Sequence, residues 1–306
     1  GSEGLRTVLV EGEAPGGQAG TSSRIENYLG FPAGLSGGDL ARRAVAQARR
    51  FGVEILTPQE AVGLRIEGPY KHITLADGSE ISCHMLMLAI GVSWNLLPAE
   101  GADRLTGAGV YYGASLSEAM HTEGRTVFMV GAGNSAGQAA MYFKDFADEV
   151  VLLVRGDSLG AKMSSYLVDR IESTDNIEVR LNAEVVRCHG ESRLEALDLK
   201  VGGGDATESV PAELLFAFLG ATPRIGWLEG LVASDDAGFI LTGTDLDPAT
   251  HLRDWPLERG PFMLETNVPG IFACGDARSG SVKRVASAVG EGSVSVSFMH
   301  QILSER

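Results

Sequence analysis

Residues 131–136, Gly-Ala-Gly-Asn-Ser-Ala, have the types and spacing of a turn that binds a dinucleotide pyrophosphate. The apolar run Thr126–Val130 comes directly before them, and a helical pattern follows. In such a turn, Gly131 bends the chain, Gly133 lets the backbone approach the ligand, and the helix N-terminus offers N–H groups to the anion. A ligand-free glycine turn is the alternative. The predicted site residues are Gly131, Gly133, Asn134, Ser135 and Ala136.

The residue at the end of the next strand selects between NADPH and NADH. An acidic residue there binds the ribose 2′-hydroxyl, whereas arginine accommodates a 2′-phosphate. Here the apolar run ending at Val154 is followed by Arg155, and Lys162 is a second nearby cation. We therefore expect NADPH, with a solvated surface arginine and use of NADH as the alternative.

Two further strand-like segments end in residues that can bind a dinucleotide. The segment Arg6–Glu11 reads as a buried strand, and Glu11 at its end can accept hydrogen bonds from an adenosine ribose. The segment Gly270–Asp276 reads as another buried strand, in which Gly275 permits close approach and Asp276 can accept a sugar hydroxyl. The two segments together predict a second dinucleotide site.

A helix is expected from about Lys283 to Leu303, with Lys283 and Arg284 in its first turn. Cations at this end of a helix oppose its dipole by roughly 0.3–1 kcal/mol each. An anion bound next to these two cations, such as reduced flavin, would offset that cost. Two solvated cations far from any ligand are the alternative.

Composition excludes several other classes of protein. The chain of 306 residues has a formal net charge of −15, which disfavours binding to nucleic acid or to an anionic membrane surface. The longest apolar run, Met85–Val92, is too short to span a bilayer. The three cysteines form no Cys-x-x-Cys pair, and the six histidines have no metal-ligand spacing, so no metal site is expected.

The remaining pattern predicts an α/β protein in which strand–glycine–helix segments alternate with hairpins. The chain opens abruptly on a strand that would normally follow an earlier strand and helix, so an N-terminal unit is expected to be missing. The expected helices and strands cover 38–51, 53–56, 61–66, 72–75, 82–89, 126–130, 150–154, 164–173, 177–181, 184–189, 194–201 and 214–219.

Several of these segments, taken in order, resemble the low-molecular-weight thioredoxin reductase family of class II pyridine nucleotide-disulfide oxidoreductase-like flavoproteins. The segments are Gly16-Gly17-Gln18, Ile25-Glu26-Asn27-Tyr28, Ala89-Ile90-Gly91, Gly131–Ala136, Gly220-Ala221-Thr222-Pro223 and Gly270–Asp276. The resemblance implies two Rossmann-like three-layer domains, with an NAD(P)H domain (109–235) inserted into an FAD domain (1–108 and 236–306). It also implies the cofactors FAD and NADPH and a homodimer. A cytoplasmic protein is expected on other grounds, because residues 1–10 show no signal-peptide pattern and no apolar run is long enough to span a bilayer.

The resemblance also assigns residues to the two cofactors. The implied FAD contacts are Glu11, Gly12, Gly16, Gly17, Gln18, Asn27, Val62, Ala89, Gly91, Gly275, Asp276, Lys283, Arg284 and Val285. The implied NADP contacts are Gly131, Gly133, Asn134, Ser135, Ala136, Arg155, Lys162 and Gly220.

The sequence departs from the family in three respects. The first strand and glycine-rich turn of the FAD domain are absent. The family's redox Cys-x-x-Cys is replaced in Tyr112–Ser117, where Gly113 and Leu116 stand in place of the thiols and neither can form a thiolate. The family's His-Arg-Arg is Val154-Arg155-Gly156, which keeps one cation.

These departures leave three functions open. The first is an FAD-dependent NAD(P)H oxidoreductase whose electron acceptor is not its own dithiol, such as a quinone, ferredoxin, oxygen or an external disulfide. The second is an enzyme like the ferredoxin or flavodoxin–NADP reductases, which also lack the cysteine pair. The third is a non-catalytic dinucleotide-binding sensory module. It is kept open because the sequence also resembles modules that are fused behind response-regulator or cyclic-nucleotide-binding domains.

Overall fold

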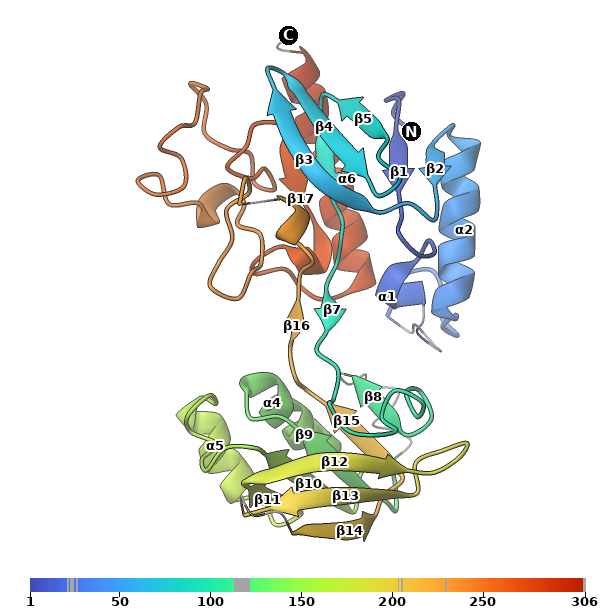
Figure 1. Ribbon diagram of the computed structural model, residues 1–306, viewed down its shortest axis with the longest axis vertical. Coiled ribbons are helices and arrows are strands. Elements are labelled where there is room, and N and C mark those ends of the chain that lie inside the picture. The colour runs from blue at the N-terminus through green and yellow to red at the C-terminus, as the bar shows by residue number, and fades with distance from the viewer. Residues whose placement is uncertain are drawn as a thin grey trace. The chain divides into compact units, whose positions relative to one another are not determined.

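The computed structural model describes residues 1–306 except 21, 23–24, 26, 113–121, 203, 205, 229 and 305–306. Its contacts divide the chain into two compact units (Figure 1). Unit 1 contains Gly1–Ser93 and Thr222–Arg306, and unit 2 contains Trp94–Ala221. One unit is therefore inserted into the sequence of the other, as the two-domain prediction requires.

The boundaries between the two units fall after Ser93 and after Ala221, nearer the N-terminus than the expected domain limits of 109 and 235. Leu97, Ala102 and Leu105 come before residue 109, yet they are buried in the core of unit 2. Leu228 and Val232 come before residue 235, yet they are buried in the core of unit 1. Apolar contacts made across the sequence thus set these boundaries, and the limits of the cofactor domains stay a prediction.

Unit 2 contains a five-stranded parallel sheet in the order β11-β10-β9-β15-β8. Its strands are β8 (Val110–Tyr112), β9 (Thr126–Val130), β10 (Glu149–Val154), β11 (Ile177–Leu181) and β15 (Leu214–Ala217). Helices α4 (Asn134–Phe143) and α5 (Ser165–Glu172) connect strands on one side of β9. The strand order is that of a doubly wound fold, in which successive strands are added outward on one side of β9 and then on the other, so that the order reverses between β9 and β15.

Alternating side chains bury both faces of this sheet. Val150, Leu152 and Val154 of β10 pack in one cluster with residues of α4 and α5. Val151 and Leu153 face the other way, into a cluster with a three-stranded antiparallel sheet. That sheet is formed by β12 (Ala183–His189), β13 (Ala196–Val201) and β14 (Thr207–Pro211). Unit 2 therefore has three layers: helices, parallel sheet and antiparallel sheet.

Unit 1 contains an antiparallel sheet and two short parallel pairs. The antiparallel strands are β3 (Ala61–Glu67), β4 (Tyr70–Leu75) and β5 (Glu80–Cys83). The parallel pairs are β1 (Val8–Val10) with β2 (Glu54–Leu56) and β17 (Ile271–Ala273) with β6 (Leu86–Leu88). Its helices are α1 (Gly17–Gly20), α2 (Gly37–Arg50), α6 (Val285–Ser304) and the 3₁₀ turns η1 (Gly226–Leu228), η2 (Gly243–Asp245) and η3 (Gly275–Ala277).

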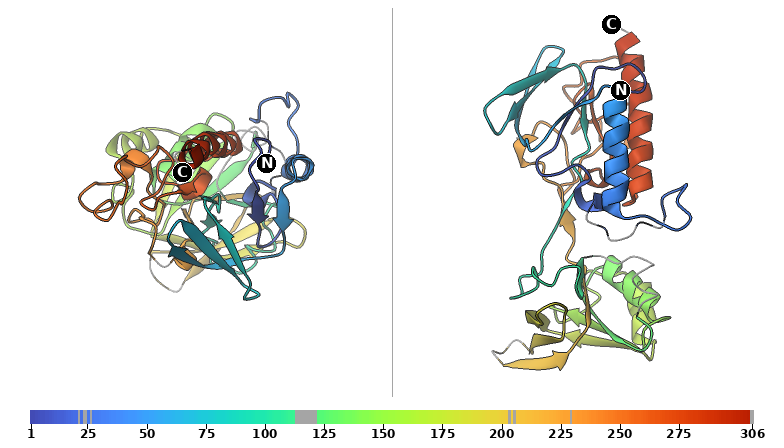
Figure 2. Two further views of the ribbon diagram at one scale, coloured as in Figure 1. Left: turned by 90° about the horizontal axis from the view of Figure 1, so that it is seen from above. Right: turned by 90° about the vertical axis from the view of Figure 1, so that its right-hand side faces the viewer.

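The two long helices of unit 1 have nearly parallel axes (Figures 1 and 2). Helix α2 begins after Ser36, whose hydroxyl accepts a hydrogen bond from the backbone N–H of Asp39 at 3.1 Å. Such a cap satisfies one of the N–H groups that the first helical turn leaves without an intrahelical partner. At the unit boundaries, β7 (Ser93–Trp94) pairs with β16 (Ala221–Thr222). Every helix in the described part of the chain is too short or too polar to cross a bilayer.

Three expectations about individual elements were wrong. The N-terminal strand covers Val8–Val10 and is not buried, because among the described residues β2 alone pairs with it, and Val8 and Leu9 remain 42% and 40% exposed. The expected strand 82–89 is two strands in different sheets, since β5 pairs with β4 and β6 pairs with β17. The last helix begins at Val285, so the two cations precede its first turn.

Candidate functional site

In unit 1, three strand ends that carry predicted site residues lie around one hydrophobic cluster. Val10 ends β1, Leu88 ends β6 and Ala273 ends β17, and all three side chains belong to this cluster. The next residues along each strand include Glu11, Ala89 and the turn at Gly275. The fold therefore brings three segments that are far apart in the sequence to one region of unit 1.

The Gly275–Asp276 corner is the best-defined part of this region. Gly275 has a φ of +69°, and a Cβ placed there would lie 3.0 Å from the Cβ of Ala288 on α6. Because left-handed backbone is costly for other residues and the approach is close, glycine is needed here. The corner thus turns the backbone sharply and places Asp276 in the half-buried position that follows.

The carboxyl group of Asp276 accepts no hydrogen bond from any described residue. Burial raises its pKa above the usual aspartate range, the charge of Lys283 lowers it, and the charge of Glu291 raises it. Nearby, the hydroxyl oxygen of Ser281 is buried and has no hydrogen-bond partner. Two polar groups in one short segment are thus left able to bind a ligand.

The other predicted groups of unit 1 lie at loop or strand surfaces. Glu11 accepts a hydrogen bond from the backbone N–H of Glu13 at 2.9 Å, which shapes the turn after β1. Gly16 has a φ of +121°, and a Cβ there would lie 2.7 Å from that of Ala41 on α2. The positions that remain exposed or partly exposed include Gly12, Gly17, Gln18, Asn27, Val62, Ala89, Gly91, Arg284 and Val285.

The side chain of Lys283 is exposed but packs against an aromatic ring. Its ammonium nitrogen lies 4.3 Å from the ring centroid of Phe239, a distance typical of a cation–π contact. This contact holds the lysine side chain near Asp276, whose carboxyl group it acts on electrostatically. Arg284 is also exposed and lies directly before α6.

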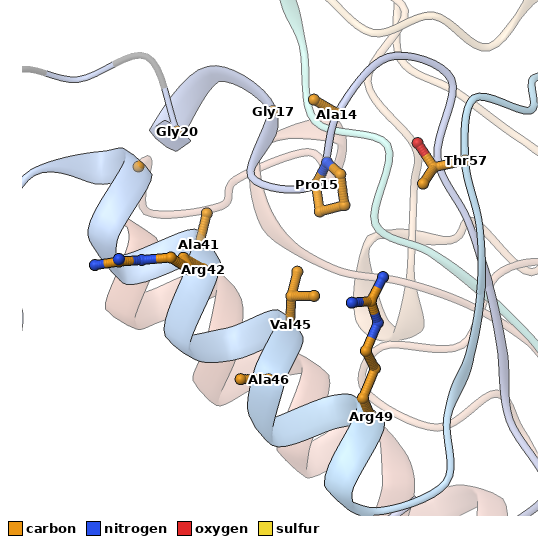
Figure 3. A pocket seen from close by; sticks show the side chains of 11 residues that line it. Ala14, Pro15, Gly17, Gly20, Ala41, Arg42, Val45, Ala46, Arg49 and Thr57 are labelled. Atoms are coloured by element: carbon orange, nitrogen blue, oxygen red, sulfur yellow. The ribbon is translucent and has the colours of Figure 1, made fainter.

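A cavity of about 580 Å³ lies between the loop after β1 and helix α2 (Figure 3). Figure 3 shows Val45 and Arg49 of α2 directed toward the side where Pro15 and Thr57 lie. Its walls are mostly apolar, with Arg42 and Arg49 as the charged members. Of the predicted FAD residues, Gly17 alone lines it, so the cavity adjoins the predicted site rather than coinciding with it.

In unit 2, the predicted nucleotide turn lies where the order of the parallel strands reverses. Gly131 follows β9, Gly220 follows the adjacent strand β15, and both have positive φ values, +152° and +80°. A Cβ on Gly131 would lie 2.9 Å from the carbonyl oxygen of Phe218, so the backbones meet here without room for a side chain. Ligands of doubly wound sheets bind at the carboxyl ends of the strands at this reversal.

Gly133 begins helix α4 as its N-cap and makes no side-chain capping hydrogen bond. The first N–H groups of a helix have no intrahelical partners, and the helix dipole makes this end electropositive. Ala136 is fully buried beneath the turn, in the cluster that holds α4 against the sheet. The predicted motif therefore has the backbone arrangement that binds a pyrophosphate.

Two contacts of this turn were not predicted from the sequence. The side-chain oxygen of Asn134 accepts hydrogen bonds from the backbone N–H and the hydroxyl of Ser164, at 2.8 and 3.1 Å. A Cβ on Gly137 would lie 2.7 Å from side-chain atoms of both Met163 and Leu167. Both contacts join α4 to the start of α5, and the small residue Gly137 was the one signal of them in the sequence.

The cations predicted to select the nucleotide lie at the surface of unit 2. Arg155 follows the buried strand β10, which neighbours β9 in the sheet, and Lys162 comes shortly before α5. Both residues are exposed, and neither forms an ion pair with a described residue. The structure thus leaves both cations able to meet an anionic group at the carboxyl end of the sheet.

Comparison with known proteins now settles the family. Residues 1–292 match the family model described as pyridine nucleotide-disulphide oxidoreductase. The chain belongs to that family. A thioredoxin reductase of Eremothecium gossypii is 30% identical over 302 residues, covering 97% of this chain and 89% of the relative. One from Peptoclostridium acidaminophilum is 29% identical over 296 residues, covering 95% and 87%.

Solved structures show the same fold. The crystal structure of thioredoxin reductase from Streptococcus pyogenes MGAS5005 matches with a TM-score of 0.84 at 24% identity, covering 100% of this chain and 92% of that one. Thioredoxin reductase from Giardia duodenalis matches with a TM-score of 0.78 at 22% identity, covering 95% and 88%. The prediction of two Rossmann-like domains is thereby confirmed.

As a member of the pyridine nucleotide-disulphide oxidoreductase family, the chain is an FAD- and NAD(P)-dependent oxidoreductase, and relatives in this family use FAD and NADPH. The residues present fit both groups. Unpartnered polar atoms of Asp276 and Ser281 suit the hydroxyl and amide groups of a flavin nucleotide. The open helix N-terminus at Gly133 suits the pyrophosphate of a nicotinamide nucleotide.

The cysteines of this oxidoreductase have unreactive surroundings. All three are free thiols, and burial raises the pKa of Cys188 and Cys274 to about 11. The pKa of Cys83 is also raised by burial, an effect that the charge of Lys71 reduces. Positions Gly113 and Leu116, where the resemblance expects the family's redox thiols, lie outside the described residues. Within the described part of the chain, no group of His, Cys, Asp and Glu side chains is arranged to hold a metal ion.

Proposed function

We propose that this oxidoreductase takes a hydride from NADPH onto FAD and delivers the electrons to an acceptor other than a dithiol of its own. The observation that carries the proposal is the combination of two glycine turns at strand ends, at Gly131–Gly133 and at Gly275–Asp276, with a sequence that contains no Cys-x-x-Cys pair. The buried, high-pKa thiols of Cys188 and Cys274 support it, since the thiolate is the reactive form in disulfide exchange.

When bound, the flavin supplies the hydride and electron chemistry, and the protein supplies binding and orientation. The backbone at Gly131 and Gly133 would bind the nucleotide pyrophosphate, and Arg155 would pair with the 2′-phosphate. The carboxylate of Asp276 would accept a hydrogen bond from a flavin hydroxyl, with the charge of Lys283 beside it. The proposal includes a homodimer and a fused regulatory domain, which the resemblance implies, and the cytoplasmic location expected from the sequence.

The test is anaerobic stopped-flow mixing of flavin-loaded protein with NADPH or NADH. We expect the flavin absorbance near 450 nm to bleach within seconds. No bleaching with either nucleotide would overturn the enzyme proposal and leave a non-catalytic dinucleotide-binding module. Steady NADPH-dependent reduction of added thioredoxin would overturn the assignment of an acceptor other than an internal dithiol.

A variant tests the nucleotide preference by calorimetric binding. We expect Arg155→Leu to weaken NADPH binding by about tenfold, the scale of one charge-assisted hydrogen bond, and to leave NADH binding nearly unchanged. The matched control is Arg170→Leu, another exposed arginine in unit 2, in the last turn of α5. An equal loss of NADPH and NADH binding in Arg155→Leu would contradict the predicted contact with the 2′-phosphate.

A further inference from the structure

One carboxylate outside the predicted site, that of Glu291, contacts the Gly275–Asp276 corner. Glu291 lies on α6, one helical turn beyond Ala288, the residue against which Gly275 packs. One oxygen of its carboxylate accepts a hydrogen bond from the backbone N–H of Gly275 at 2.7 Å. The helix therefore holds the turn by a packing contact and by a hydrogen bond.

The charge of Glu291 is balanced by an arginine from the same turn. A guanidinium nitrogen of Arg278 lies 2.7 Å from the second carboxylate oxygen, and both side chains are about 15% exposed. Another nitrogen of Arg278 donates to the carbonyl oxygen of Ser279 at 2.8 Å. Breaking this ion pair would leave an unpaired charge in a largely buried position, which is costly. The pair therefore holds Gly275 before Asp276 and Arg278 after it.

The same carboxylate acts on Asp276 through its charge. The groups that face Asp276 electrostatically are Lys283, from the segment before α6, and Glu291, from α6 itself. Glu291 opposes the ionisation of Asp276, and Lys283 favours it. The neighbouring thiol of Cys274 is protonated at neutral pH because burial raises its pKa to about 11. After burial, which is the main cause of the raised pKa of Asp276, and the opposing charge of Lys283, Glu291 adds a smaller charge effect, and it also holds the backbone of the residue before Asp276.

We propose that Glu291 is a positioning residue for the flavin: it holds the Gly275–Asp276 corner against α6, and with Arg278 it sets the charge that the corner presents to the ligand. This inference rests on the proposed function, because it takes Asp276 to bind the flavin. It adds that the N–H of Gly275 is committed to Glu291 and that flavin binding depends on an ion pair beneath the corner.

Two variants that change charge but keep a hydrogen-bonding side chain separate positioning from mere stability. Glu291→Gln removes a negative charge and keeps an oxygen for the Gly275 N–H, so the pKa of Asp276 should fall. Arg278→Gln removes the balancing positive charge, so the pKa of Asp276 should rise. We expect opposite shifts of about half a unit or more, the scale of a partly screened charge close by.

The pKa of Asp276 is measured by carboxyl ¹³C NMR in protein stripped of flavin, and FAD affinity is measured against pH. The acid pH at which FAD affinity is half lost should shift in the same direction as the Asp276 pKa in each variant. The matched control is Glu265→Gln, which changes another buried glutamate of unit 1 that pairs with an arginine and accepts backbone N–H bonds. It should shift neither quantity.

The outcomes are distinguishable. Unchanged Asp276 titration in both variants, or shifts in the same direction, would overturn the role of Glu291. If wild-type protein binds no FAD at any pH, the proposed function and the flavin role of Glu291 both fail. If wild-type protein binds FAD but the acid midpoint does not follow the NMR pKa values, the inference alone fails.

Discussion

The most informative single residue is Asp276, because its setting disfavours the charged form that is proposed to bind the flavin. Burial raises its pKa, so the folded protein holds the neutral acid more readily than the unfolded chain does. Above its folded pKa the group is ionised in both states, and the folded state bears the cost of burying the charge. As pH falls below the folded pKa and then the unfolded value of about 3.9, that cost disappears.

Asp276→Asn should therefore raise the stability of flavin-free protein at pH 7 while weakening FAD binding. The stabilisation should shrink as the pH falls through the folded pKa and should vanish below the unfolded one. Thermal unfolding between pH 3.5 and 8, with FAD affinity measured in parallel, checks both effects. Lower stability of the variant at pH 7 would mean that Asp276 has a stabilising partner in the unliganded protein.

Residue types alone predicted the corner itself but not what holds it. The glycine at 275 and the acid at 276 follow a buried apolar strand, and this local pattern in the sequence is enough to predict a turn there. Glu291 lies 15 residues after Asp276 on a helix whose orientation depends on packing, so no local spacing predicts its contact with Gly275. Ser164 was missed for the same reason, since its bond to Asn134 joins residues 30 apart.

At the scale of elements, α4 and α5 are joined at their N-terminal ends by the Asn134–Ser164 contact. Asn134→Ala should lose both hydrogen bonds and lower the free energy of unfolding by about 1 kcal/mol. It should also weaken NADPH binding, because the segment between β10 and α5 carries Arg155 and Lys162. The comparison variant Ser164→Ala keeps the backbone bond to Asn134 and should lose roughly half as much.

Urea unfolding and nucleotide calorimetry on the two variants measure these effects. Equal losses of stability in both would show that the hydroxyl bond, rather than the backbone bond, carries the contact. An unchanged NADPH affinity in Asn134→Ala would mean that the segment before α5 holds its place without this link.

Elements with strong local signals were predicted well, and the exceptions have physical causes. Ile177–Leu181 was predicted with the bounds that the structure gives, because a short apolar strand between turn signals has few alternatives. The segment 82–89 was predicted as one strand because it runs without a turn signal from the Ala76-Asp77-Gly78 turn to Gly91. The division into two strands depends on their partners, since β5 pairs with β4 and β6 pairs with β17. The local pattern of apolar residues does not predict such pairing.

At the scale of the whole molecule, the proposed reaction requires that the protein contain no thiol pair able to accept electrons. The three cysteines lie in both units: Cys83 and Cys274 in unit 1 and Cys188 in unit 2. A thiol with a pKa of about 11 is ionised to about one part in a thousand at pH 8, whereas a free cysteine is ionised to about a quarter. Reaction of the folded protein with a thiol reagent should therefore be slow.

We expect half-buried Cys83 to react first with Ellman's reagent at pH 8, Cys188 and Cys274 to react far more slowly, and all three to react in denaturant. Excess NADPH under anaerobic conditions should not increase the number of reactive thiols, because no disulfide is present to be reduced. The Cys83→Ser variant identifies the first thiol and serves as the control. Two additional thiols released by NADPH would contradict the proposed acceptor and would place a redox disulfide in the working protein.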